Sequence, residues 1–489
     1  CLSILFIMNL AVKIAYNSLA QLGGRFFGTL LGLFAVAIMT RYLGSALFGQ
    51  YTTIVTYASV FAIAADLGLT LVASQMINRV GVDEKKTLAN LFAFRSVTAL
   101  VMIGLAPLTV WWLPYETIVK VGVVVATGSF WFISLNQVFV SVFQKHLKTE
   151  RIALAEVLSR LLLVGLTAYV AMADLGLIGM VAAMTISNAL YFALHWGMSR
   201  SLIKFAWRFD WPVWKEIWHL SWPLLLTIVS NLIYLKADIL LLSFLRSPVE
   251  VGLYGAAYKV VDILVSLPFM FAGLMLPLLV KYWSSKLKDK FGSAVQMMLD
   301  ATGVFAWPIL VGGFVLAVPI MVAVTGADFA DSGLILRILL IAIVAVYFSC
   351  ALTHAIIGLA KQRTLIVYYL ITALVSLPVY LFLIKNYGVY GAAWGTVFSE
   401  VLICSFAWWR LQKELGMVFK NSINFKALVA AVMMGALLWP LRSWADTLCG
   451  LIVLVVGAAA VYCLIVWRFG LLKNFDLANL KYEQKNISN

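Results

Sequence analysis

Charged residues are scarce in this chain. Only 12% of its 489 residues are Asp, Glu, Lys or Arg, and 63% are hydrophobic, whereas a soluble domain carries about 25% charged residues. This composition excludes a water-soluble globular protein. The alternation of apolar and polar residues over about ten positions that marks a membrane β-barrel is also missing.

Cysteine is scarce too, and the familiar motifs of catalysis are absent. The five cysteines are scattered, with no C-x-x-C pair and no His/Cys cluster at metal-ligand spacing. No P-loop, H-E-x-x-H, G-x-S-x-G or dinucleotide-binding motif occurs, and no loop is long enough to fold as a catalytic domain. We therefore predict no catalytic residues, no metal site, no cofactor and no enzymatic activity.

Long apolar runs are what the chain has in abundance. Each is long enough to cross a bilayer as a helix. The first run is too long for the core of a signal peptide, so we expect a span there, with Met8 as a plausible start of translation. The sequence predicts an all-α polytopic membrane protein with 14 transmembrane helices. They lie near 11–40, 51–73, 88–113, 117–143, 152–173, 176–197, 219–243, 252–280, 300–325, 333–358, 364–385, 389–409, 425–443 and 449–467.

The basic residues gather on one side of these spans. The formal net charge is +15, and 25 of the 36 Lys and Arg residues lie on the side that holds the termini and the even-numbered loops. Six lie on the opposite side, at or near the ends of the spans, and five lie deeper inside the spans. The positive-inside rule places both termini in the cytoplasm. Because topology explains the basic charge, we expect no nucleic-acid partner.

Three pairs of segments resemble each other in the same order along the chain. Residues 48–59 match 251–262, 145–149 match 360–364, and 175–188 match 387–400. A duplicated six-helix unit explains this order. Because six is even, both copies enter the membrane from the same side as parallel repeats. The predicted domains are an N-terminal lobe (1–198, helices 1–6), a cytoplasmic interfacial linker (199–218), a C-terminal lobe (219–415, helices 7–12), and helices 13–14 with a cytoplasmic tail (416–489).

The linker combines tryptophan with basic residues. Four tryptophans share one predicted helical stripe, among basic side chains, and this combination is typical of a segment in the headgroup layer of a membrane. The tryptophans are Trp207, Trp211, Trp214 and Trp218.

Arg25 lies near the middle of the first span. A charge there costs about 2.5–3.5 kcal/mol on insertion scales. Asn17, Gln21, Gly28 and Gly32 share its helix face. A polar stripe of this kind indicates a face turned to protein or to a water-filled cavity. The alternative is an arginine paired with a buried carboxylate or with carbonyl groups for packing alone.

Four more basic side chains lie inside spans, and both copies of the repeat contribute. Together with Arg25 they would attract an anion, and the planar fork of arginine suits phosphate. The predicted substrate-binding residues are Arg25, Arg160, Lys236, Lys259, Arg95, Gln21 and Asn17.

Acidic side chains inside the spans are candidates for ion coupling. A carboxylate in a cavity of low dielectric can bind and release protons near neutral pH. The candidates are Asp66, Asp238, Asp262 and Glu400. Two alternatives stay open: Asp66 could brace the chain, and Asp262 could form a structural pair with Lys259 on the same helical face.

Several segments of the chain resemble polysaccharide flippases of the MOP exporter superfamily. They are "RYLGSALFGQY" (41–51), "ADLGL" (65–69), the stretch over 221–260, and "GLAKQRT" with "YGVYGAAWGTVFSE". The resemblance covers nearly the whole chain. It implies two six-helix lobes around a V-shaped central cavity, with helices 13 and 14 as an extra pair. The cationic cavity of that branch matches Arg25 and Arg160 by type and depth.

The resemblance also implies a function. Such a protein would move undecaprenyl-pyrophosphate-linked oligosaccharide, an O-antigen or related unit of lipopolysaccharide biosynthesis, between the leaflets of the bacterial inner membrane. It would use alternating access driven by an H+ or Na+ gradient. Membrane lipids and the polysaccharide polymerase machinery are the further partners that it implies.

Two other functions remain as alternatives. A multidrug cation antiporter of the same superfamily would need an acidic cavity and usually has twelve helices. A membrane-embedded polymerase or ligase of lipid-linked sugars would need a sizeable outer loop, whereas the outer loops predicted here are short.

Overall fold

The computed structural model describes residues 2–77, 83–202, 207–416 and 419–471. For residues 2–22, 71, 74 and 223–235 it describes the helix but not the side chains. Asn17 and Gln21, which were predicted to share the face of Arg25, therefore lie outside the described side chains.

The described part of the chain is helical throughout and contains no strand. Eleven of its helices are long and apolar enough to cross a membrane. The elements are α1 (Leu2–Asp66), α2 (Leu69–Ile77), α3 (Glu84–Thr109), η1 (Val110–Trp112), α4 (Thr117–Lys145), α5 (Thr149–Met172), α6 (Gly176–Ser199), α7 (Trp211–Leu245), α8 (Pro248–Ser284), α9 (Lys288–Thr325), η2 (Ala327–Phe329), α10 (Ser332–Gly358), α11 (Gln362–Leu415), α12 (Ser422–Leu438), η3 (Trp439–Asp446) and α13 (Leu448–Arg468).

Helix α1 is two spans joined at Gly44, where φ is 65° and ψ is 178°. A side chain would be strained at this positive φ. Before the break, the Tyr42 hydroxyl donates to Asp174 beyond the end of α5, at 2.6 Å. After it the chain turns back, so that Asp66 reaches Arg95 in the first half of α3.

Helix α11 is divided in the same way at Gly388 (φ 59°, ψ −135°). Its two halves form a hairpin in which Tyr380 hydrogen-bonds Ser399 at 3.3 Å. An ion pair between Lys361 and Glu414 closes the open end. With both halves of α1 and α11 counted, helical segments correspond to all fourteen predicted spans. The predicted fold class, an all-α polytopic membrane protein, is confirmed.

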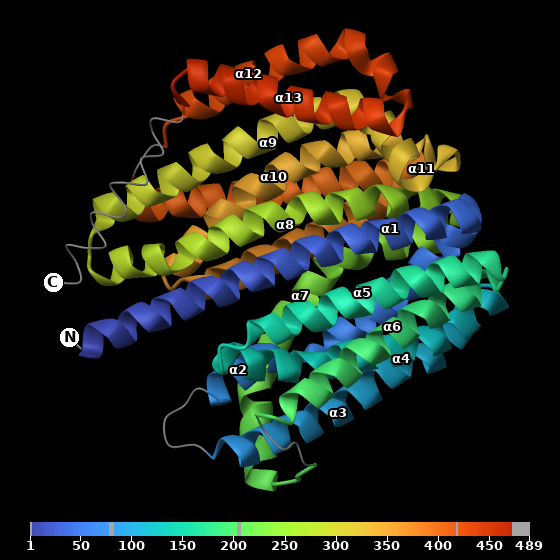
Figure 1. Cartoon of the computed structure of the whole chain (residues 1–489), viewed down its shortest axis with the longest axis vertical. Helices are drawn as coiled ribbons and strands as arrows, with labels where there is room; N and C mark the ends of the chain where they lie inside the picture. Colours follow the sequence, from blue (N-terminus) through green and yellow to red (C-terminus); the bar gives the residue numbers. More distant parts are fainter. Residues whose placement is uncertain (1, 78–82, 203–206, 417–418, 472–489) are drawn as a thin grey trace. The chain divides into compact units, whose positions relative to one another are not determined.

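The helices form two compact units, Cys1–Gly255 and Ala256–Asn489. In the first unit, α3, α4, α5 and α6 lie alongside one another (Figure 1). In the second, α12 and α13 pack on α9 through a core that includes Leu316, Ala430 and Leu454. The lobes predicted at 1–198 and 219–415, with the linker and the final pair, stay a prediction.

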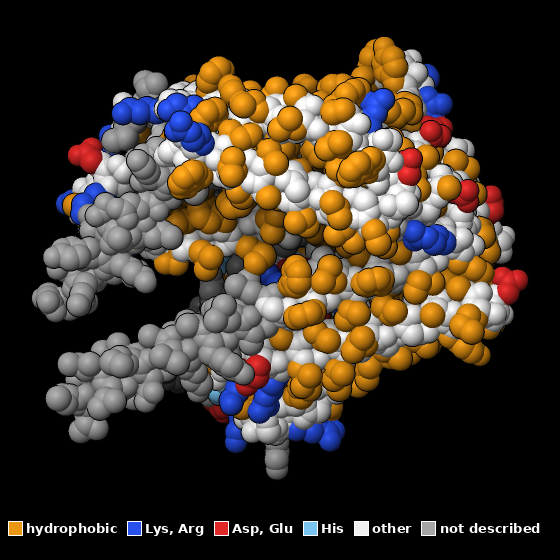
Figure 2. Space-filling view, turned by 45° about the horizontal axis from the view of Figure 1, so that its top comes forward, with side chains coloured by type: hydrophobic (Ala, Val, Ile, Leu, Met, Phe, Trp, Pro, Cys, Tyr) orange, Lys and Arg blue, Asp and Glu red, His pale blue; other side chains and the backbone are white. Residues whose placement is uncertain are grey.

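The surfaces of both units are those of membrane helices. Hydrophobic side chains cover the middle of the visible face, while charged side chains gather toward the helix ends (Figure 2). Exposed Phe34, Leu274 and Val456 show the same pattern. The transfer of such side chains from water to lipid is favourable, so an apolar surface suits a position in the membrane.

The predicted repeat appears in the backbone. Gly176, at the start of α6, and its predicted counterpart Gly388 have φ values of 63° and 59°. Leu147 and Ala360, just before α5 and α11, have φ values of 50° and 57°. The backbone therefore makes Leu147 and Ala360 equivalent positions of the two repeats. The sequence match of 145–149 to 360–364 aligned the final threonines instead, and it is shifted from the backbone equivalence by two residues.

Two glycines that the repeat predicts to be equivalent touch each other in the first unit. A Cβ added to Gly49 would lie 1.7 Å from the carbonyl oxygen of Pro248. A Cβ added to Gly252 would lie 2.0 Å from the carbonyl oxygen of Ser45. Only glycine allows this approach of α1 and α8, and the two contacts mirror each other.

The predicted linker is partly helical. Helix α7 begins at Trp211, so Trp207 precedes it and the predicted stripe of four tryptophans is not continuous. Trp214 packs on Phe94 with ring centres 5.0 Å apart. Trp211 and Trp218 remain exposed, as side chains in a headgroup layer would be.

Candidate functional site

Four polar side chains meet in the first unit at a position well inside the spans. Arg25 comes from α1, Glu156 and Arg160 from α5, and Tyr191 from α6. We call these four the arginine cluster.

Two glycines bring α1 close enough to α5 to form the arginine cluster. A Cβ added to Gly24 would lie 2.4 Å from the Cβ of Ala153. A Cβ added to Gly28 would lie 3.1 Å from Oε1 of Glu156. The small-residue face of α1 therefore rests on α5, and this contact sets Arg25 beside the carboxylate of Glu156.

The arginine cluster carries an excess of positive charge. The carboxylate of Glu156 interacts electrostatically with both Arg25 and Arg160. Within the described side chains, neither arginine has a carboxylate at ion-pair distance, within 4 Å. Both arginines are exposed. A charge that faced lipid at this depth would be costly.

Two of the four members of the arginine cluster were among the predicted site residues. Arg25 and Arg160 were predicted to bind the substrate, and the structure brings them together around one carboxylate. Glu156 and Tyr191 were missed. Glu156 and Arg160 are four residues apart, so they share one face of the helix. This spacing could have identified Glu156 as a neighbour of Arg160.

Arg95, predicted to bind the substrate, and Asp66, predicted to couple ions, form an ion pair with each other. Nη2 of Arg95 lies 2.5 Å from Oδ1 of Asp66. Thr70 donates to the same oxygen at 2.6 Å, and Nε of Arg95 donates to Ser134 at 3.3 Å. The network lines a cavity of about 480 Å³ between α1, α2, α3 and α4, together with Gln137. Arg95 is only 2% exposed, so this arrangement favours the bracing role that was left open for Asp66.

The other predicted residues of helices 7 and 8 have different surroundings. Asp238 is buried on α7, accepts a hydrogen bond from the Tyr254 hydroxyl at 2.8 Å, and so ties α7 to α8. Lys236 and Lys259 are half-buried, and Asp262 is exposed.

Glu400 lies in a polar group of the second unit. It interacts electrostatically with Tyr369, whose hydroxyl is hydrogen-bonded to Thr353. A carboxylate and two hydroxyls offer oxygen atoms to a hard cation or hold a proton. In the parts of the chain that the structure describes, no group of three or more His, Cys, Asp or Glu side chains could hold a metal ion.

The model of a family described as "Polysaccharide biosynthesis protein" matches residues 38–334, more than half of the chain. The chain belongs to this polysaccharide biosynthesis protein family. The resemblance seen in the sequence is thereby confirmed at the level of the family. Among curated proteins, none matches the chain significantly.

Solved structures with the same fold are membrane transporters. A lipid II flippase MurJ in an inward closed conformation has a TM-score of 0.76 at 18% identity, over 93% of this chain and 98% of that one. An inward-facing multidrug resistance MATE transporter of the MOP superfamily has a TM-score of 0.66 at 15% identity, over 80% and 95%. A MOP superfamily transporter from Pyrococcus furiosus has a TM-score of 0.55 at 13% identity, over 83% and 96%. At these identities the likeness shows the fold, that of MOP transporters.

Proposed function

We propose that this protein is a flippase for undecaprenyl-pyrophosphate-linked oligosaccharide, an O-antigen or related surface polysaccharide unit. It moves the unit from the inner to the outer leaflet of the bacterial inner membrane, and both of its termini are cytoplasmic. The observation that carries the proposal is the pair of exposed arginines, Arg25 and Arg160, at membrane depth around a single carboxylate.

The chemistry of the arginine cluster fits a pyrophosphate. Each guanidinium can donate two parallel hydrogen bonds to a phosphate group. The cluster holds two such groups against one carboxylate, and this excess of positive charge suits an anion better than an organic cation. The family match to polysaccharide biosynthesis supports a sugar as the rest of the cargo.

A lipid-linked sugar needs such a path because it cannot cross a bilayer unaided. Its hydroxyls and phosphates would lose their hydration in hydrocarbon at a cost of several kcal/mol for each group. A polar face bordered by water removes most of this barrier, while the isoprenoid tail stays in lipid. Alternating access then exposes the arginine cluster to one leaflet at a time.

An ion gradient supplies the direction of transport. Glu400, beside the Tyr369 hydroxyl, combines a carboxylate and hydroxyl oxygens that can hold H+ or Na+. Asp238, Asp262 and Asp66 remain proposed coupling residues of lower rank, because Asp238 and Asp66 already bind Tyr254 and Arg95.

The test is transport of lipid-linked oligosaccharide in cells that carry Arg25→Gln, Arg25→Lys or Arg160→Gln. Each glutamine variant removes charge-assisted hydrogen bonds to phosphate, so we expect transport to fall about tenfold or more. The lysine variant keeps the charge and should recover part of the activity.

Arg41→Gln is the matched control, because Arg41 is on the same helix and donates to the carbonyl of Ala37 at 3.0 Å, away from the cluster. It should leave transport unchanged at equal protein level in the membrane. Normal transport by both Arg25→Gln and Arg160→Gln would overturn the proposal. Loss of resistance to cationic drugs with normal polysaccharide would favour a multidrug antiporter.

A further inference from the structure

The second unit has an apolar pocket whose lining includes none of the residues of the arginine cluster. The pocket has a volume of about 540 Å³ and lies between α9, α10 and α12, so we call it the α9–α12 pocket. Only apolar residues line it, among them Leu310, Phe314, Ile341, Val432 and Trp439. Its volume is in the range of pockets that hold small molecules.

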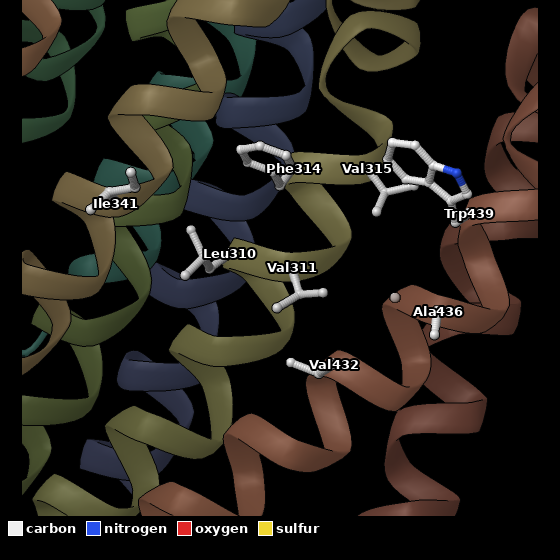
Figure 3. A pocket seen from close by; sticks show the side chains of 9 residues that line it. Leu310, Val311, Phe314, Val315, Ile341, Val432, Ala436 and Trp439 are labelled. Atoms are coloured by element: carbon white, nitrogen blue, oxygen red, sulfur yellow. The ribbon is translucent and has the colours of Figure 1, made fainter.

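Two aromatic side chains mark one end of the α9–α12 pocket. Phe314 and Trp439 lie at the upper end of the view in Figure 3, and Val432 lies toward the lower end. Trp439 begins η3, the short helix that also contains the exposed Trp444. Tryptophans are enriched where a membrane meets water, so this end of the pocket lies at headgroup depth.

An arginine stacks on each of these two aromatic rings. The guanidinium of Arg337 is 5.0 Å from the ring centre of Phe314, and Nε of Arg337 donates to the Phe314 carbonyl at 2.9 Å. The guanidinium of Arg442 is 4.2 Å from the ring centre of Trp439.

These contacts leave most of the N–H groups of both guanidinium ions available. Within the described residues, no carboxylate lies at ion-pair distance, within 4 Å, of Arg337 or Arg442. Each guanidinium carries five N–H donors, and the contacts above use one of them on Arg337.

We propose that the α9–α12 pocket binds an anionic phospholipid, with an acyl chain in the pocket and the headgroup phosphate held by Arg337 and Arg442. An apolar slot with two cations at its headgroup end matches a lipid that has an apolar tail and a negative head. Basic side chains beside apolar clefts between membrane helices recognise acidic headgroups in this way. The ring stacking holds the guanidinium ions in place, which lowers the entropy lost on binding.

The test is titration of the full-length, detergent-solubilised protein with phosphatidylglycerol, and with phosphatidylcholine as the zwitterionic comparison. Native mass spectrometry gives the number of bound lipids and the Kd. We expect one site that prefers phosphatidylglycerol. Each of Arg337→Gln and Arg442→Gln should raise the Kd about fivefold.

Ala436→Phe places a large side chain in the pocket and leaves both arginines unsubstituted, because Ala436 is exposed on α12 and lines the cavity. It should weaken binding of the same lipid. Lys120→Gln is the control, because Lys120 also stacks on an exposed tryptophan, Trp111, at 5.6 Å but does not line this pocket. It should leave the Kd unchanged.

Several results would overturn the proposal. One is equal affinity for phosphatidylglycerol and phosphatidylcholine. Another is a Kd for phosphatidylglycerol that neither the arginine variants nor Ala436→Phe changes. A third is a rise of the Kd in Lys120→Gln as large as in the arginine variants. A dimer that Ala436→Phe dissociates without lipid would assign the pocket to a second copy of the chain. Tighter binding of undecaprenyl pyrophosphate that displaces phosphatidylglycerol would assign it to the cargo lipid. None of these results depends on transport, so the proposed function is tested separately.

Discussion

The guanidinium of Arg95 and the carboxylate of Asp66 form an ion pair in the first unit, although 29 residues separate them in the chain. Both sit on faces of membrane helices where an isolated charge would be costly. Their pairing neutralises two of the charges that the sequence placed inside spans. The arginine cluster, by contrast, keeps an excess of positive charge, because its two arginines share the single carboxylate of Glu156.

Loss of the ion pair between Arg95 and Asp66 should reduce the stability of the fold more than it reduces transport. Arg95→Gln leaves the Asp66 carboxylate without its partner, and we expect a loss of about 3 kcal/mol in the free energy of unfolding. Asp66→Asn should cost a similar amount, and the double variant should recover part of the loss. Thermal unfolding in detergent measures all three. Full stability of Asp66→Asn combined with abolished transport would instead make Asp66 a coupling residue.

Glu156→Gln should change how the arginine cluster releases its cargo. Without this carboxylate the two arginines keep their full attraction for a phosphate group, so binding tightens and release slows. We expect the half-saturating substrate concentration to fall about fivefold and the maximal rate to fall with it. Transport assays in proteoliposomes separate the two quantities. Glu150→Gln, on the same helix beside Lys148, is the control and should change neither.

The side chain of Gln296 fastens the segment before α12 to α9. Its Nε2 donates to the carbonyl of Lys420, and its Oε1 accepts from the amide of Lys420, each at 2.8 Å. Gln296→Ala removes both bonds, together with the bond from Nε2 to Oδ1 of Asp300 at 2.9 Å, and should cost about 1–2 kcal/mol. Hydrogen exchange of the Lys420 amide should accelerate accordingly. Lys420→Ala is the control, because both bonds involve the main chain of residue 420 and not its side chain. If the amide of residue 420 exchanged as fast in Lys420→Ala as in Gln296→Ala, this account would be contradicted.

The contact between Gly49 and Gly252 should tolerate no side chain. Gly49→Leu forces α1 and α8 apart and should cost at least about 3 kcal/mol, visible as a lower melting temperature or loss of protein from the membrane. Gly252→Leu should be equally damaging, because its surroundings mirror those of Gly49. Gly32→Ala is the comparison, since nothing lies within 4 Å of a Cβ there. If Gly49→Leu melted like Gly32→Ala, the helices would not be in backbone contact.

Acid should weaken the attachment of α7 to α3. The ammonium group of Lys86 hydrogen-bonds Asp210 and holds the pKa of that carboxyl below its ordinary value of 3.8. A lowered folded-state pKa means that the pair contributes stability above the ordinary pKa and loses it as the pH falls through the folded value. Stability measured between pH 7 and about pH 3 should therefore depend less on pH in Asp210→Asn. Lys86→Gln should flatten the profile in the same way, and an unchanged slope in both variants would rule out this linkage.

The positions of the helices could be predicted because hydropathy reports them directly. The spans follow from the length of the apolar runs. The breaks at Gly44 and Gly388 fall between predicted spans, at glycines that can adopt a positive φ. The ion pair of Asp66 and Arg95 could not be predicted, because its members lie on different helices whose rotation depends on packing. The resemblance to flippases singled out Arg25 and Arg160 by type and depth, but the carboxylate of Glu156 that lies between them was not predicted.

Another part of the site was within reach of the sequence but was overlooked. Glu156 stands four residues before Arg160, and that spacing alone puts the two side chains on one face. Its neighbour Tyr191, on α6, could be found only once the helices were packed together.

The mirrored contact of Gly49 and Gly252 bears on how this chain arose. Each glycine meets the carbonyl four residues before the other, and a reciprocal contact of this kind is what two identical subunits make across a two-fold axis. A six-helix ancestor encoded by a single copy of the repeat would have formed the contact with a second molecule of itself, using one glycine twice. Fusion of two such copies would turn the homodimer contact into an internal one, and two separate codons would then have to encode the glycine that one codon encoded before.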